Sequence, residues 1–389
     1  MSLNSFTAFL DSQHSLDKQT KRGYSLCVRR FEGIALRKFE ECYLDPETVH
    51  KVLAELDTQL AESTWNLWLQ RYQRLAKWLS DPDDEECPKL WRKVESKKID
   101  WNKKLKDKCL TEEEFLKLLD VVDNPRDKAF FAVGADGGLR PGELLSMNIG
   151  DCRPESYGFD ITVSGKTGTR VVQLIWSASV LRYWLNHHSL KHNRDAPLWL
   201  QRSSYGFNRI SYSAMNKYHL KRYCALAGIY RWKTVVDKKT GQPKKINAVS
   251  LHYLRHTSVT WAAQSKKAHI SVKTANEIYG WTSNSPMYLR YIHLSGKDSK
   301  SARLALAGIK EELEEKPSVL AQSKCLNCGE LNGAGSMYCC SCGYPLNADA
   351  ARELLDKRRM EMDLLKLQPE ILKLLREKAE KEEAEKGKK

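Results

Sequence analysis

Two cysteine pairs near the carboxyl end place the strongest spatial constraint on this chain. Cys325 and Cys328 form one C-x-x-C pair, Cys339 and Cys342 form a second, and a short glycine-containing loop separates them. Four thiolates at this spacing are typical of a tetrahedral zinc ribbon. Because four sulfur ligands leave no open position for water, we expect a structural Zn²⁺ that holds a module too small for its own core. The adjacent Cys340 is expected to be a spectator.

Composition favours folded domains and a polyanionic partner. The chain has 389 residues, 41% apolar content and a net charge of +15, and bound phosphates would release condensed counterions. Charge alone suits an unspecific basic surface equally well. The start has no basic region followed by an apolar core, and no later run is long enough to span a bilayer. We therefore expect a cytoplasmic, nucleoid-associated protein with no membrane partner and reduced thiols outside the cysteine cluster.

Helical periodicity dominates residues 1–86, which we expect to form a small helical bundle. The apolar residues of the 63–79 segment share one helical face and are expected to pack in the core. They are Trp65, Trp68, Tyr72, Leu75 and Leu79. An acidic breaker at 81–86 precedes a lysine-rich stretch, so an interdomain linker is predicted over residues 87–108. Its charge suits either a solvated segment or one that follows DNA phosphates.

A second domain is expected over residues 109–306. Thr111 and Glu114 form a capping box before its first apolar helix. Two β-branched runs in the 158–174 segment flank a Gly-Lys-Thr-Gly turn, which predicts a hairpin, and residues 232–246 are predicted to form a basic protruding finger. The fold class is therefore mainly α with a small antiparallel sheet.

Three smaller segments are expected after the second domain. Residues 307–323 are predicted to form a charged helix or linker, and residues 324–346 the zinc ribbon. Residues 347–389 are predicted to form an amphipathic helix that ends in a solvated Glu/Lys tail.

Several residues form a constellation suited to phosphodiester cleavage, which without a metal needs a nucleophile, cations and an acid. Arg140 lies in a glycine- and proline-containing turn that leaves one guanidinium projecting. His252 and Arg255 lie three residues apart on one helical face, and a guanidinium beside an imidazole suits a phosphate. Tyr288 and Tyr291 are candidate nucleophiles on a later helix.

Two other motifs are considered and excluded. His252 and His256 have the spacing of a zinc-protease helix, but that motif needs Glu where this chain has Tyr253. The Gly-Lys-Thr triplet at 165–167 suggests a P-loop, but Asp160 stands where the first glycine belongs.

The segments Leu-Arg-Pro-Gly-Glu-Leu at 139–144, His-x-Leu-Arg-His at 252–256 and Arg-Tyr-x-His at 290–293 together resemble the three boxes of the tyrosine recombinase (phage integrase) family. The resemblance covers residues 111–306 and implies an α+β catalytic domain of the DNA breaking-rejoining type. The N-terminal bundle, residues 1–86, resembles the family's core-binding domain more loosely, which implies that it binds DNA. The cysteine-rich segment is similar to the C-terminal module of some archaeal integrases.

The resemblance also implies roles for individual residues. Arg140 and Arg255 would hold the scissile phosphate, and Lys166 would act as general acid toward the departing 5′ oxygen. His252 matches the first histidine of the second box. These assignments place the phosphate-binding groups on three separate segments of the chain.

The third box carries the proposed nucleophile. Trp281 stands where many family members have histidine, and its indole N–H can still donate to a phosphate. Tyr291 matches the nucleophile through the Tyr-x-His pattern with His293. The interval from Trp281 is one residue longer than is common, so Tyr288 remains an alternative.

The function implied is site-specific recombination through a 3′-phosphotyrosyl intermediate, without ATP or a catalytic metal. The implied partners are double-stranded DNA, a homotetramer on paired DNA sites and accessory DNA-bending proteins. Residues 325–389 are expected to contribute to synapsis or to DNA contact. Two alternatives are a type IB topoisomerase and a catalytically silent DNA-binding regulator, which the presence of all the box residues disfavours.

Overall fold

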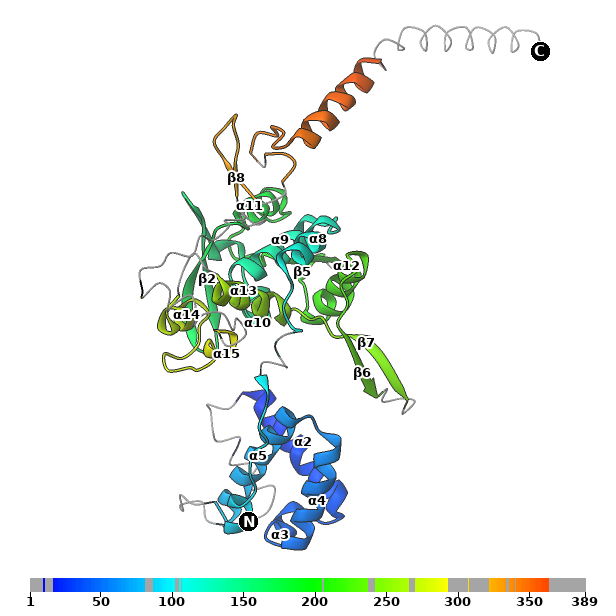
Figure 1. The fold of residues 1–389 in the computed structure, drawn as a ribbon, viewed down its shortest axis with the longest axis vertical. Coiled ribbons are helices and arrows are strands. Elements are labelled where there is room, and N and C mark those ends of the chain that lie inside the picture. Colours follow the sequence, from blue (N-terminus) through cyan, green and yellow to red (C-terminus); the bar gives the residue numbers. More distant parts are fainter. Residues whose placement is uncertain are drawn as a thin grey trace, which may run out of the picture. The chain divides into compact units, whose positions relative to one another are not determined.

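The chain divides into two compact units, Met1–Trp101 and Asn102–Lys389, which are considered separately (Figure 1). The computed structural model describes residues 10, 17–80, 87–101, 105, 107–204, 206–236, 242–265, 270–292, 307, 322–333, 336–339 and 341–363. Across these residues the fold is mainly helical with small antiparallel sheets, which confirms the predicted fold class. No helix within the described ranges is long and apolar enough to cross a membrane.

The N-terminal unit is a helical bundle with an aromatic core. Its helices are α2 (Lys18–Ala35), α3 (Phe39–Cys42), α4 (Pro46–Gln59), α5 (Glu62–Ser80) and α6 (Lys89–Arg92). Asp17 caps α2 by accepting a hydrogen bond from the Thr20 amide at 2.8 Å. The rings of Phe31, Phe39 and Tyr72 are buried and pack edge-on or stacked, with centroids 4.8–5.8 Å apart. The face predicted for α5 is the buried one, although Leu79 is only half-buried.

The lysine-rich stretch predicted as a linker packs in part on this bundle. Trp91 is fully buried, and its indole N–H donates to the Tyr43 carbonyl at 2.8 Å. Further along, Asn66 exchanges two hydrogen bonds with the backbone of Lys97, at 2.8 and 2.9 Å. The bundle therefore extends beyond residue 86. Burial of one large aromatic side chain stabilises this segment, and the surrounding lysines can keep their charged ends in water.

The second unit contains most of the helices. They are α8 (Glu112–Asp120), α9 (Pro125–Asp136), α10 (Pro141–Ser146), α11 (Ala178–His187), α12 (Lys221–Leu226), α13 (His252–Gln264), α14 (Val272–Ile278) and α15 (Leu289–Ile292), with a 3₁₀ turn η1 (Ile149–Asp151) and a π-helical segment η2 (Ala214–Leu220). The predicted capping box of α8 is present, with Thr111 and Glu114 bonding each other's backbone amides.

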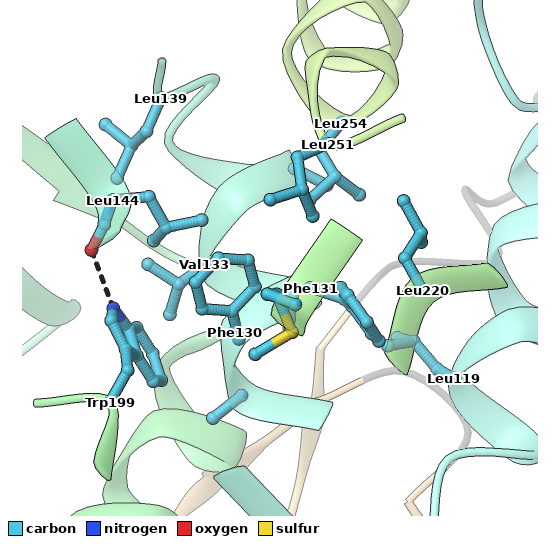
Figure 2. Close-up of a cluster of buried hydrophobic side chains, with 14 of the residues drawn as sticks. Leu119, Phe130, Phe131, Val133, Leu139, Leu144, Trp199, Leu220, Leu251 and Leu254 are labelled. Atoms are coloured by element: carbon cyan, nitrogen blue, oxygen red, sulfur yellow. Dashed lines mark hydrogen bonds between the residues drawn. The ribbon is translucent and has the colours of Figure 1, made fainter. Parts of the chain in front are cut away.

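Helix α9 forms the centre of the core of the second unit. Phe130, Phe131 and Val133 of α9 are fully buried, and Figure 2 shows them among side chains from α10 and α13. The indole N–H of Trp199 donates to the Leu144 carbonyl at 2.7 Å. This large core side chain therefore supplies a hydrogen-bond donor to a carbonyl near the end of α10. This packing fixes the carboxyl end of α9, where the chain turns toward Arg140.

Three strands form an antiparallel sheet beside this core. They are β1 (Cys152–Glu155), β2 (Gly158–Gly165) and β3 (Gly168–Leu174), in the order β1-β2-β3. Gly165 pairs with Gly168, so Lys166 and Thr167 form a two-residue turn at the tip, and the predicted hairpin is confirmed. A smaller hairpin joins β4 (Leu200–Ser203) to β5 (Gly206–Arg209).

The predicted basic finger is a two-stranded hairpin of β6 (Trp232–Val236) and β7 (Pro243–Asn247) that projects from the unit (Figure 1). The base of the hairpin is anchored at Arg231, whose guanidinium forms an ion pair with the Glu114 carboxylate at 2.8 Å. Asn247 accepts a hydrogen bond from the Arg231 amide at 3.0 Å. Because an isolated hairpin is marginally stable in water, these anchors support the projecting strands.

The cysteine-rich segment lies against α11. Strands β8 (Ser323–Lys324) and β9 (Leu331–Asn332) pair antiparallel, and the Gly333 amide donates to Ser179 Oγ of α11 at 2.7 Å. Arg182 of α11 forms an ion pair with Glu330 at 2.5 Å. A final helix covers residues 348–363. The charged helix or linker predicted over residues 307–323 lies outside the described residues except at 307, 322 and 323, and the predicted tail also lies outside them.

Candidate active site and cysteine cluster

Three arginines converge on the carboxyl end of helix α14. Arg170 of β3 donates to the Ile278 carbonyl at 3.1 Å, Arg255 of α13 to the Tyr279 carbonyl at 2.6 Å, and Arg140 to the Gly280 carbonyl at 2.7 Å. The last carbonyls of a helix have no partner within the helix and carry partial negative charge. Three consecutive carbonyls therefore collect guanidinium groups from three distant parts of the chain.

Gly280 makes this convergence possible. It ends α14 in a left-handed conformation, with φ of +60°, and the following Trp281 amide returns to the Asn276 carbonyl at 2.8 Å. A Cβ atom at Gly280 would lie 2.6 Å from a guanidinium nitrogen of Arg170. Both the backbone conformation and the close approach thus require glycine.

Glu143 fixes two of the three arginines. Its carboxylate accepts hydrogen bonds from Arg140 at 2.7 Å and from Arg170 at 2.9 and 3.1 Å, and its side chain is only 2% exposed. Burial alone would raise the pKa of Glu143, but the hydrogen bonds from Arg170 and Arg140 lower it to about 2. The carboxylate is therefore ionised at neutral pH and balances part of the positive charge.

Arg255 is the most deeply placed of these cations. Its guanidinium also donates to the Gly138 carbonyl at 2.8 Å, next to the Arg140 turn. Burial, followed by the charge of Arg140, lowers the pKa of Arg255 to about 10, so it keeps its charge at neutral pH. The same guanidinium lies 5.0 Å from the ring centroid of Trp281, within cation–π distance.

Tyr291 of α15 lies beside this group. Its ring stacks with that of Trp281 at 6.3 Å between centroids and 26° between planes. Its hydroxyl lies 2.7 Å from Nδ1 of His256, the last residue of the second box. Burial raises the pKa of Tyr291 to about 12, and nearby Arg255 opposes that increase. Tyr288 is equally buried and belongs to the same apolar cluster.

Lys166 and His252 are both on the exposed side of the site. Lys166 is in the turn between β2 and β3, and its neighbour Thr167 donates to the Gly280 carbonyl at 2.9 Å, which holds the turn against the arginine cluster. His252 is the first residue of α13 and is exposed, whereas Arg255 one turn later is buried. Position 293, which completes the Tyr-x-His pattern, lies outside the described residues.

The structure thus gathers Arg140, Arg255, Trp281 and Tyr291 and adds residues that sequence reasoning missed. Glu143 had a usable signal, since it occupies the third helical position after Arg140 and can return to its amide. His256 had been considered only as a metal ligand. Arg170 had no local signal, because its partners are 27 and 108 residues away in the chain.

The predicted metal ligands also come together. The Sγ atoms of Cys325, Cys328, Cys339 and Cys342 all lie within 4.8 Å of one another. Each C-x-x-C pair forms the same turn, in which the amide of Gly329 or Gly343 returns to the first cysteine's carbonyl at 2.9 Å. Cys340 lies outside the described residues.

Groups around the sulfurs fit a thiolate-bound metal. Side-chain amides of Asn327 and Asn332 donate to the sulfurs of Cys342 and Cys339 at 3.5 and 3.6 Å. Such donors stabilise thiolate charge and orient the ligands. Asn332 is fully buried, although it is in a small module. The donor set and its surroundings therefore fit a closed tetrahedral zinc site.

Comparisons with known proteins identify a related sequence family and similar folds. The sequence profile of the Phage integrase family matches residues 108–297. XerH site-specific recombinase bound to palindromic difH substrate, in a post-cleavage complex, is 18% identical with a TM-score of 0.56 over 74% of this chain and 80% of that chain. A lambda integrase(75-356) dimer bound to a COC′ core site is 15% identical with a TM-score of 0.54 over 81% and 98%.

A lambda integrase tetramer bound to a Holliday junction is also similar, at 15% identity and a TM-score of 0.51 over 73% of this chain and 77% of that chain. No curated protein sequence matches the chain. At these identities the solved structures show a similar fold, and the family profile matches residues 108–297 by sequence. Residues 108–297 therefore form a domain of the phage integrase, or tyrosine recombinase, family.

Proposed function

We propose that this chain is a site-specific recombinase that cuts and rejoins DNA through a 3′-phosphotyrosyl bond to Tyr291. One observation carries the proposal: Trp281 contacts both the Arg255 guanidinium and the ring of Tyr291. A cation that can bind a phosphate and a phenol that can attack it are thus held by the same indole. Family membership supports this assignment of roles.

The arginines would bind and stabilise the reacting phosphate. A guanidinium has five N–H donors, and the two backbone bonds described for Arg255 leave others for phosphate oxygens. Arg140 is 28% exposed, so it is reachable from solvent while Glu143 fixes its position. Preorganised donors of this kind stabilise the charge that develops in the transition state, and the loss of one costs about 3 kcal/mol.

The reaction proposed begins with in-line attack by the Tyr291 oxygen on the scissile phosphorus. The bond to the 5′ oxygen breaks, and Lys166 at the adjoining turn supplies a proton to that leaving oxygen. His252 and Trp281 are assigned to hydrogen bonding with the phosphate. Because the phosphotyrosyl bond keeps the energy of the phosphodiester, a 5′ hydroxyl from another duplex can religate without ATP or a catalytic metal.

Double-stranded DNA is the proposed partner, with four subunits on two paired sites so that both duplexes can be cut. The similarity to a lambda integrase tetramer bound to a Holliday junction supports this assembly. The β6–β7 hairpin adds exposed lysines at 233, 244 and 245 to the second unit. Lysines bind phosphate oxygens without reading sequence, so the hairpin would add affinity rather than specificity.

We also assign a structural Zn²⁺ to the cysteine cluster, held by Cys325, Cys328, Cys339 and Cys342. When bound, the ion would join the two C-x-x-C turns and supply folding free energy to a module without a large core. The contact of this module with α11 supports a role in shaping the second unit. A role for residues 325–389 in synapsis or DNA contact is tested by recombination with a chain that ends at residue 315.

The function is tested by trapping the covalent intermediate. The protein is incubated with DNA that flanks its own gene, denatured and examined by mass spectrometry for nucleotide attached to tyrosine. We expect a 3′-phosphotyrosine at Tyr291 that is absent from Tyr291→Phe. An adduct at Tyr288 would move the nucleophile by one helical turn, whereas tight binding without any adduct would contradict the proposal.

A supercoil-relaxation assay separates recombination from topoisomerase activity. The proposed recombinase joins strands between paired sites and needs its recognition sequence in the plasmid. Efficient relaxation of plasmids that lack the site, without strand exchange, would instead favour a type IB topoisomerase.

A further inference from the structure

His256 touches the proposed nucleophile, although the sequence patterns left it without a catalytic role. Its Nδ1 lies 2.7 Å from the Tyr291 hydroxyl, and the two ring centroids are 6.0 Å apart. Tyr291 is only 2% exposed and His256 is half-buried, so water competes weakly for this hydrogen bond. The contact joins α13 to α15.

Helix α13 presents Arg255 and His256 to the same site in two directions. Consecutive residues of a helix point about 100° apart, as follows from 3.6 residues per turn. Arg255 points to the carbonyls of Gly138 and Tyr279, while His256 reaches Tyr291. One rigid helix thereby positions a phosphate-binding cation and an imidazole beside the attacking oxygen.

We propose that His256 is the general base that accepts the proton of Tyr291 during cleavage and returns it during religation. The proposal rests on the function proposed above and adds a catalytic residue to it. In this arrangement Nδ1 is unprotonated and the Tyr291 hydroxyl donates to it.

The charges around His256 support this direction of the hydrogen bond. Burial, followed by the charges of Lys108, His252 and Arg255, lowers the pKa of His256 to about 4. The ring is therefore neutral at pH 7 and can accept a proton. The groups that face it from its own helix are His252 and Arg255; Lys108 comes from the segment before α8, and Tyr291 from α15. A bound phosphate would offset these cations and raise the basicity of His256 toward the working pH.

The proton balance of the step is complete. The Tyr291 oxygen forms its bond to phosphorus as its proton passes to Nδ1 of His256, and the bond to the 5′ oxygen breaks as that oxygen takes a proton from Lys166. Religation reverses both transfers: Lys166 recovers its proton from the attacking hydroxyl, and His256 protonates the departing tyrosine oxygen.

The first test reads the tautomer directly. Nitrogen-15 NMR of the histidine-labelled full chain distinguishes an unprotonated Nδ1 from a protonated one, and His256→Asn assigns the signal among the 10 histidines. We expect an unprotonated Nδ1 in the free protein, whose shift changes in Tyr291→Phe. A protonated Nδ1 would mean that His256 donates to tyrosine, and the proposal would be overturned.

The second test measures cleavage against pH. Asparagine places Oδ1 close to the position of Nδ1, so His256→Asn keeps the acceptor but cannot take the proton. Its matched control is His187→Asn, an exposed histidine of α11 whose Nδ1 contacts only the local Tyr183 carbonyl among its described hydrogen bonds. The substrate carries a 5′-bridging phosphorothiolate at the cleavage site, because a sulfur leaving group removes the need for an acid.

We expect His256→Asn to cleave about 10²- to 10⁴-fold more slowly than wild type at pH 7. Its rate should rise about tenfold per pH unit, since hydroxide then removes the tyrosine proton, while His187→Asn follows wild type. An equal loss at every pH would indicate positioning alone, and an unchanged rate would indicate no role; either result overturns the proposal. If wild type itself forms no adduct, the result contradicts the proposed function rather than the role of His256 within it.

Discussion

Replacing the buried carboxylate beside two arginines should destabilise the second unit strongly and in a pH-dependent way. In Glu143→Gln the side chain keeps its size but loses its charge, while Arg140 and Arg170 remain in place. Lowering the pKa of Glu143 from 4.5 to about 2 corresponds to about 2–3 kcal/mol of stabilisation of the ionised form, with some allowance for solvent screening. For a unit of this size that amounts to roughly 5–10 °C in melting temperature.

The pH dependence follows from the direction of the pKa shift. A folded-state pKa below the unfolded value gives stability that is present above about pH 4.5 and is lost as the pH falls toward 2. The difference in unfolding free energy between wild type and Glu143→Gln should therefore narrow by roughly 1 kcal/mol between pH 7 and pH 3.5. Urea unfolding at the two pH values measures this difference.

Glu114→Gln provides the matched control. Glu114 also pairs with an arginine, Arg231, but both side chains are about a quarter exposed, at 28% and 24%. Such a pair contributes at most about 1 kcal/mol. Equal losses of unfolding free energy in Glu143→Gln and Glu114→Gln at pH 7 would contradict the strong stabilisation assigned to the Glu143 carboxylate. A difference in unfolding free energy between wild type and Glu143→Gln that does not change with pH would contradict it too.

Three further results are expected. Gly280→Ala should lower the melting temperature and slow cleavage more than Gly228→Ala, since both have positive φ but only Gly280 also has a guanidinium in the path of a Cβ atom; equal effects in melting and cleavage assays would remove the steric argument. Zinc analysis should find one ion per chain, and Cys328→Ser should lose it together with stability; a retained ion would argue against four-thiolate binding. Changing Lys244 and Lys245 to Gln should weaken DNA binding and reduce its salt dependence by about two counterions in titrations, while an unchanged slope would place the hairpin away from DNA.

Local patterns predicted the parts of the site that are encoded locally. The Arg140 turn, the capping box at Thr111, the two hairpins and the cysteine spacing each depend on a few neighbouring residues, and each is present in the structure. Backbone preferences act over such short distances, so these features can be predicted from the sequence.

Contacts between distant segments could not be predicted from local patterns. Arg170 looks like an ordinary strand residue until β3 is placed beside α14. The burial of Trp91 was not predicted, because the lysines around it dominate the composition of the segment. Composition describes a whole segment, whereas burial depends on a single side chain. The contact between His256 and the Tyr291 hydroxyl likewise joins two separate helices, and no spacing rule contains it.

The three carbonyls at the end of α14 have a consequence for how this site can change during evolution. Backbone oxygens are the same in every residue, so the exposed side chain at 278 can be replaced while the acceptor for Arg170 persists. A single-residue deletion in α14, by contrast, would rotate these carbonyls by about 100° around the helix. We therefore expect relatives of this chain to tolerate substitutions at the exposed position 278 and to reject changes in the length of α14.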